Sequence, residues 1–263
     1  MVPRMGENAR PSVLGRLASV RGVARARTLP FFAVGGVHLA AHAVAGLGVG
    51  AAGALAGFTK PALMPALGLV LADGLDGVRQ AAGRLPRWWP LAAGAVGFSW
   101  LGDLALMHPD GFLAGVGLFG VAQVCYATTF VRAGDASRTA GRPGLLVPYA
   151  VWWAGLLGFF AATQGVTPMT GAVAGYGLLL GAMAHLAHRV SPTAAVGAGL
   201  FVLSDSLIGL RGSGVQLPLD GVWVMSTYLL AQWLIVRELV ALGARQGDAA
   251  PVAARTGATA SGD

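Results

Sequence analysis

Apolar residues run along the chain in long blocks, separated by short stretches rich in Gly, Arg and Asp. A helix needs about 20 mostly apolar residues to cross the hydrocarbon of a bilayer. Eight blocks approach this pattern, and the second is the shortest. They are Phe31–Ala51, Pro61–Ala72, Trp89–Met107, Phe112–Val131, Leu145–Thr163, Met169–His188, Thr193–Leu210 and Leu219–Leu242. The pattern predicts an all-α polytopic membrane protein, a bundle of eight transmembrane helices.

The composition agrees with this interpretation. Of the 263 residues, 55% are apolar and 11% are charged, and the mean hydropathy is +0.66. Such values are typical of membrane proteins. The longest internal loops, 73–88 and 132–144, are too short for a soluble domain. We therefore expect one membrane domain, residues 31–242.

The net charge of +7 would suggest a nucleic-acid partner if the basic residues were clustered. Instead, sixteen of the eighteen lie in alternate loops, on the side that holds the N-terminus, and only Lys60 and Arg211 fall on the other side. The positive-inside rule then predicts a cell-membrane protein with an even number of spans and both termini in the cytoplasm. No nucleic-acid partner is expected.

The ends of the chain differ from its middle. Residues 1–30 form a basic segment, which we expect to be cytoplasmic and retained. Residues 243–263 are poor in large apolar side chains and are predicted to be a disordered cytoplasmic tail. Cys125, the single cysteine, excludes an intramolecular disulfide. Glycines at four-residue spacing favour close helix packing, and a homo-oligomer stays open.

Two aspartates interrupt predicted spans. Asp103 lies in "FSWLGDLALM", roughly 8 Å below the outer end of its helix, and Asp205 lies in "FVLSDSLIGL", roughly 9 Å below the same surface. A carboxylate in hydrocarbon is costly, so it marks a functional site or a buried pair. Since the depths agree, we predict that both face one hydrated cavity in the outer half of the bundle.

Other polar residues surround these aspartates in the predicted arrangement. Lys60 opens the second span at the outer boundary and is a candidate counter-ion. The others are Ser204 beside Asp205, Tyr228 and Gln232 at i, i+4 on the last span, and Gln123 and Tyr126 at i, i+3 on the fourth. The alternatives are a structural ion pair to Lys60 and hydrogen bonds that hold helices together.

The histidines give little support for a metal. His38 and His42 share one helical face, whereas His185 and His188 are expected at the cytoplasmic end of their span. A zinc site needs three or four converging ligands. We predict no metal.

Five segments together resemble the YhhN-like family of integral-membrane lysoplasmalogenases. They are "TKPALMPALGLVLA", "FSWLGDLALM", "LFGVAQVCYATTF", "LFVLSDSLIGL" and "STYLLAQWLIV", in that order over most of residues 59–237. The family's Gly-Asp matches Gly102 and Asp103, its Ser-Asp matches Ser204 and Asp205, its Lys-Pro matches Lys60 and Pro61, and its Tyr/Ala-Gln matches Tyr228, Ala231 and Gln232. Many relatives have His where this chain has Gln123.

The resemblance implies hydrolysis of the vinyl-ether bond of a lysophospholipid within the membrane, without a cofactor. Such a reaction needs a proton on the alkenyl carbon, stabilisation of an oxocarbenium ion, and attack by water. Two carboxylates can divide these tasks, as in glycosidases. The hypothesis is that the aspartate less exposed to Lys60 is the general acid, and that the other stabilises the cation and orients water. Candidate substrate contacts are Lys60, Gln123, Tyr126, Ser204, Tyr228 and Gln232.

Two rival functions use the same residues. A proton-coupled transporter of lipids or small molecules would use the paired aspartates as a relay, although the chain has no obvious inverted repeat. A metal-dependent lipid amidase would use His38, His42 and an aspartate.

Overall fold

The computed structural model describes the backbone of residues 13–259 and the side chains of residues 28–247. This part of the chain holds eight α-helices and no strand. Their bounds are α1 Val13–Gly46, α2 Gly50–Ala82, α3 Trp89–Ala105, α4 Phe112–Ala133, α5 Val147–Gln164, α6 Pro168–Ala187, α7 Pro192–Gly212 and α8 Asp220–Thr259, with short 3₁₀ turns at Ala136–Arg138 and Pro143–Leu145. The all-α prediction is confirmed.

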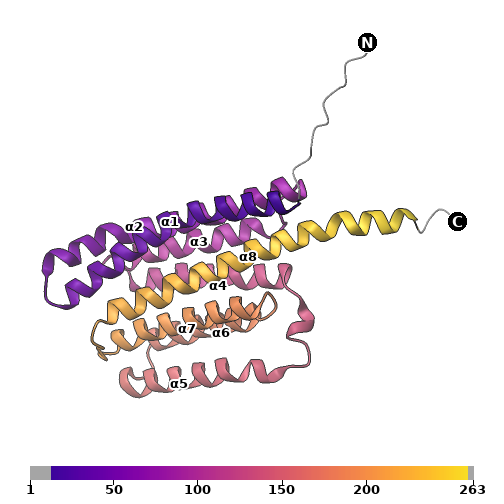
Figure 1. Cartoon of the computed structure of the whole chain (residues 1–263). Helices are drawn as coiled ribbons and strands as arrows, with labels where there is room; N and C mark the ends of the chain where they lie inside the picture. The colour runs from indigo at the N-terminus through magenta and orange to yellow at the C-terminus, as the bar shows by residue number, and fades with distance from the viewer. Residues whose placement is uncertain (1–12, 260–263) are drawn as a thin grey trace, which may run out of the picture.

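The helices run antiparallel to their neighbours in sequence, and the α1–α2 turn projects beyond the other loops at the end opposite the termini (Figure 1). Packing follows the order of the chain only in part. α8 lies against α1, α2 and α7, while α4 packs on α6 and skips α5. α5 forms one edge of the bundle, and Phe160 is its only buried residue.

Seven helices are long and apolar enough to cross a membrane, counted over the described residues. The chain is therefore a multi-pass membrane protein. α3, with 17 residues, is shorter than the others. It packs between α2 and α4.

Several predicted boundaries are wrong. α2 continues through Asp73 and Asp76 to Ala82, so most of the predicted loop 73–88 is helical. No proline interrupts this stretch, and Gly83 ends the helix with a left-handed conformation, φ 72°. Polar residues such as Asp73 and Asp76 argue against a helix only inside the hydrocarbon. A helix that extends beyond the hydrocarbon can carry them.

The ends of the bundle also differ from the prediction. α8 does not stop at Leu242 but continues to Thr259. Gln246 holds this extension, because its Nε2 donates to the Ala133 carbonyl at 2.9 Å and its Oε1 accepts from Trp88 Nε1 at 3.2 Å. α1 begins at Val13, inside the predicted basic segment. The arginines of residues 1–27 lie outside the described side chains.

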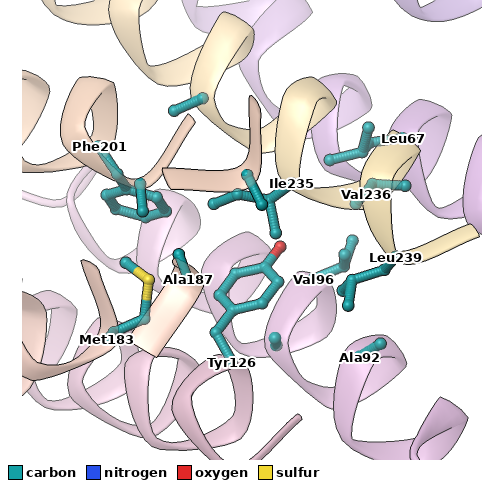
Figure 2. Close-up of a cluster of buried hydrophobic side chains, with 14 of the residues drawn as sticks. Leu67, Ala92, Val96, Tyr126, Met183, Ala187, Phe201, Ile235, Val236 and Leu239 are labelled. Carbon is teal, nitrogen blue, oxygen red and sulfur yellow. The ribbon is translucent and has the colours of Figure 1, made fainter. Parts of the chain in front are cut away.

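The buried core joins seven of the eight described helices, all but α5. Figure 2 shows Tyr126 of α4 amid apolar side chains from α2, α3, α6, α7 and α8, among them Leu67, Val96 and Ile235. Tyr126, Leu67 and Ile235 are each 0% exposed. A polar hydroxyl in the middle of this core needs a buried partner.

Close packing of α2 on α8 depends on Gly74, because a Cβ there would lie 2.5 Å from Val240 Cγ2. We expect Gly74→Ala to lower the free energy of unfolding by about 1–3 kcal/mol, the usual cost of overpacking. The matched control is Gly77→Ala on the same helix, where no atom lies within 4 Å of the added Cβ. Thermal unfolding in detergent micelles measures both. Equal stability of the two variants would contradict this packing.

Candidate functional site

The second helix carries two prolines that shape the site. Pro65 has no N–H, so the carbonyl of Pro61, four residues earlier, loses its helical hydrogen bond. Trp100 of α3 fills this gap, since its Nε1 donates to the Pro61 carbonyl at 2.9 Å. The interaction fixes α3 against α2, one residue beyond Lys60.

Lys60 and Asp103 form an ion pair across this contact. Lys60 Nζ lies 3.7 Å from Asp103 Oδ1, and the two side chains are 19% and 5% exposed. The other carboxylate oxygen, Oδ2, accepts a hydrogen bond of 2.8 Å from the Tyr228 hydroxyl on α8. A charge and a hydrogen bond thus satisfy both oxygens of Asp103, which offsets the cost of burying it.

Behind Tyr228 lies a buried hydrogen-bond network centred on Gln232. Its Nε2 donates to the Tyr228 hydroxyl at 3.3 Å and to Ser99 Oγ at 3.0 Å. Its Oε1 accepts from the Tyr126 hydroxyl. One amide therefore connects α3, α4 and α8, and it accounts for the buried Tyr126 hydroxyl seen in Figure 2.

Asp205 has a parallel but smaller set of partners. Tyr176 of α6 donates its hydroxyl to Asp205 Oδ2, and Gln123 Nε2 lies 3.4 Å from the same hydroxyl. Gln123 Oε1 is buried and has no hydrogen-bond partner among the described residues. Within residues 28–247, no cationic side chain pairs with Asp205, in contrast to Asp103.

A cavity of about 600 Å³ opens at the end of the bundle that carries the α1–α2, α3–α4 and α7–α8 turns. Both aspartates line it. Arg211 and Asp220, whose Nη1 and Oδ2 lie 3.6 Å apart, join the ends of α7 and α8 near its mouth. A second, apolar pocket of about 60 Å³, called the apolar extension below, lies between α4, α5, α6 and α7, and Asp205 lines it as well. Asp205 therefore stands where the polar and apolar spaces meet.

The structure brings five of the eight predicted site residues to this cavity, namely Lys60, Asp103, Ser204, Asp205 and Tyr228. The remaining three, Gln123, Tyr126 and Gln232, are each 0% exposed and lie behind the cavity wall. Ser204 also joins α7 to α8, because its hydroxyl donates to the Val224 carbonyl at 3.1 Å.

Tyr176 is the site residue that the sequence reasoning missed. It stands in the glycine-rich stretch "AGYGLLLG", which favours a packing role. The depth of Tyr176 along its helix is the sequence signal that could have identified it. α6 begins at Pro168 at the end of the bundle that carries the cavity, and eight residues place Tyr176 roughly 12 Å below it, within a helical turn of the Asp205 depth.

The histidines divide between the two ends of the bundle. His38 and His42 line the cavity, with ring centroids 4.7 Å apart, whereas His185 and His188 do not. Among the described residues, no group of three or more His, Cys, Asp or Glu side chains could hold a metal ion.

The fold and the site define a class, a multi-pass membrane protein with two carboxyl groups in one buried cavity. The YhhN family pattern matches residues 55–239, which include every residue of the two aspartate networks. The chain belongs to the YhhN family. No solved structure matches it.

The chain is also similar to proteins named lysoplasmalogenase TMEM86B. It is 32% identical to that of Rattus norvegicus over 146 residues, which cover 55% of this chain and 59% of the relative. The Mus musculus protein is 31% identical over 56% of this chain and 62% of its own length. The Homo sapiens protein is 32% identical over 55% and 61%. The chain thus spans about three fifths of the length of the curated relatives that it matches.

Gln232 and Gln123 differ in the number of buried hydrogen bonds that they make. Gln232→Leu would leave the hydroxyls of Tyr126 and Ser99 without their amide partner, whereas Gln123→Leu would remove one long hydrogen bond. We expect Gln232→Leu to cost about 1–3 kcal/mol of unfolding free energy, and Gln123→Leu to cost less. Thermal unfolding in detergent compares the pair. A larger loss for Gln123→Leu would contradict the network described above.

Proposed function

We propose that this chain is a membrane hydrolase that cleaves the vinyl-ether bond of lysoplasmalogens. The products would be a fatty aldehyde and glycerophosphocholine or glycerophosphoethanolamine. The observation that carries the proposal is the position of Asp205, at the boundary between a polar cavity and an apolar extension. A vinyl-ether bond is likewise the point where the polar head of such a lipid joins its hydrocarbon chain. Family membership and the relatives named lysoplasmalogenase support the same reaction.

The different partners of the two aspartates support different roles for them. Asp103 faces Lys60 at 3.7 Å and is the ionised member of the pair. Asp205 has no cation beside it in the described part of the chain and accepts one hydrogen bond at Oδ2. Asp205 is half-buried, and a carboxyl without a counter-charge keeps its proton more readily than one that faces a cation. Asp205 is therefore the general acid, with the proton on Oδ1.

The reaction then follows from these positions. Asp205 transfers its proton to the alkenyl carbon next to the ether carbon, and the electrons of the double bond form the new C–H bond. The oxocarbenium ion that results is stabilised by the Asp103 carboxylate. Water adds to the ether carbon, and the hemiacetal that forms breaks down to aldehyde and alcohol. Tyr228 and Tyr176 hold the two carboxyl groups in place.

The residues behind the wall have an indirect role. Gln232 and Gln123 each contact the tyrosine that bonds an aspartate, so they position the catalytic pair and do not touch the lipid head. Tyr126 acts through Gln232. Lys60 and Ser204 face the cavity and remain candidates for contact with the polar part of the substrate.

The hydrocarbon chain would enter the apolar extension lined by Phe119, Trp152 and Phe160. Its volume of about 60 Å³ is too small for a fatty chain, since one water molecule alone occupies about 30 Å³ in the liquid. The wall that must move is α5, which has the fewest buried residues among the described spans. Trp152 Nε1, which donates to Ser206 Oγ at 2.8 Å, links this helix to α7.

Asp205→Asn and Asp103→Asn test the catalytic pair. We expect each to reduce the turnover of alkenyl lysophospholipid by at least about 100-fold, the usual minimum for loss of an acid–base group. Asp110→Asn, in the α3–α4 turn and outside the cavity lining, is the control and should retain wild-type turnover.

Mass spectrometry of the products identifies the reaction as well as its rate. Purified protein is incubated with alkenyl, alkyl and acyl lysophospholipids side by side. Aldehyde from the alkenyl lipid alone supports the proposal. Full turnover by either aspartate variant would refute the dyad, and lipid flux in liposomes without any product would favour a transporter.

The topology is a further part of the proposal. We infer eight spans, α3 included, in the cell membrane with both termini in the cytoplasm, because the basic residues favour that side. Reporter enzymes fused after residue 263 and inserted at Gly165, in the α5–α6 turn, should report opposite sides, the first cytoplasmic and the second extracytoplasmic. The same side for both would contradict the topology.

A further inference from the structure

His38 is a buried histidine in the cavity wall that the steps above leave unused. It lies on α1, is 0% exposed, and lines the cavity together with Lys60 and both aspartates. The family pattern begins only at residue 55, so neither the family match nor the predicted site includes this position.

Hydrogen bonds fix which nitrogen of His38 carries the proton. Its Nδ1 lies 2.8 Å from Thr59 Oγ1. The Thr59 hydroxyl also lies 3.0 and 3.1 Å from the carbonyls of Leu55 and Ala56, and its one proton can go to either of them. With the proton there, Thr59 Oγ1 accepts from Nδ1–H, and in the neutral imidazole Nε2 carries the free lone pair.

The Nε2 atom is buried and has no hydrogen-bond partner among the described residues. Leaving such an atom unpaired costs about 1–3 kcal/mol. An apolar side chain would fill the same position without this cost. An oriented imidazole with a free lone pair is the arrangement found in a general base, where a second group holds the other nitrogen.

A phosphate contact is the alternative role for this side chain. It would need a second proton on the ring, because only an N–H can donate to a phosphate oxygen. Lys60 follows Thr59 on α2 and faces the same cavity, so it already supplies the positive charge on this wall. A second cation beside it would be repelled.

We propose that His38 is the base that takes a proton from the attacking water, a step that rests on the proposed hydrolase function. As the water oxygen bonds to the ether carbon, Nε2 accepts one of its protons. The glycerol oxygen then leaves with the C–O electron pair and takes that proton from Nε2. The hydroxyl proton of the hemiacetal passes to the Asp205 carboxylate as the aldehyde C=O forms. Both groups return to their starting state, and no other reactant is needed.

Four variants separate a base from a structural residue. His38→Asn retains a donor toward Thr59 but has no base, and should reduce kcat by about 100-fold or more with KM unchanged. Thr59→Val should reduce kcat by a smaller factor, and Thr59→Ser should restore it. His185→Asn is the matched control, because His185 also has a buried unpartnered nitrogen but lies outside the cavity lining.

Deuterium exchange in D₂O distinguishes the step that is lost. In His38→Asn, Asp205 can still deliver a deuteron to the alkenyl carbon, but water attack is slow and the cation returns to substrate. Recovered substrate should therefore carry deuterium at that carbon, whereas wild-type protein should leave little. A raised KM without exchange would identify a binding role and overturn the proposal, as would full turnover by His38→Asn.

Nitrogen NMR of histidine-labelled wild-type protein provides a test that does not depend on activity. The signal assigned by its loss in His38→Asn should show a protonated Nδ1 and an unprotonated Nε2. The opposite tautomer would overturn the proposal even if the hydrolase function holds. If wild-type protein makes no aldehyde, the hydrolase function fails, and the tautomer alone decides whether His38 is arranged as a base.

Discussion

The cost of placing two carboxyl groups inside a membrane bundle governs this structure. Each aspartate is held by a tyrosine hydroxyl from another helix, and each of those hydroxyls is contacted in turn by a glutamine amide. The two sets differ in one respect, since only Asp103 faces a cation. In the proposed function, this difference would let two chemically identical side chains take opposite protonation states, which an acid-catalysed reaction through a cation requires.

The surrounding helices supply that asymmetry. Pro65 in α2 leaves the Pro61 carbonyl free, Trp100 donates to it, and this contact brings α3 against α2 beside Lys60. On the other side of the cavity, α6 and α7 bring Tyr176 to Asp205, and both residues line the apolar pocket. Asp205 thus lines both the cavity and the apolar extension, an arrangement that supports the proposed cleavage of a lipid at its head-to-chain junction.

The sequence predicted the parts of the site that depth along a helix determines. Asp103 and Asp205 share a predicted level below Lys60, and the structure places all three on one cavity. Rotation about the helix axes is not encoded so directly. The sequence therefore did not reveal that Gln232 and Gln123 point behind the wall, or that Tyr176 points at Asp205. The extent of α2 and α8 does not follow from hydropathy, because helices can continue through polar residues beyond the hydrocarbon.

The central claim is that Asp205 is protonated at rest while Asp103 is ionised. Infrared spectroscopy of the protein in lipid measures this directly, through the carbonyl stretch of a protonated carboxyl group. Wild-type protein should show such a band. The band should remain in Asp103→Asn and disappear in Asp205→Asn. A band that survives Asp205→Asn and vanishes in Asp103→Asn would contradict the assignment of the two carboxyl groups.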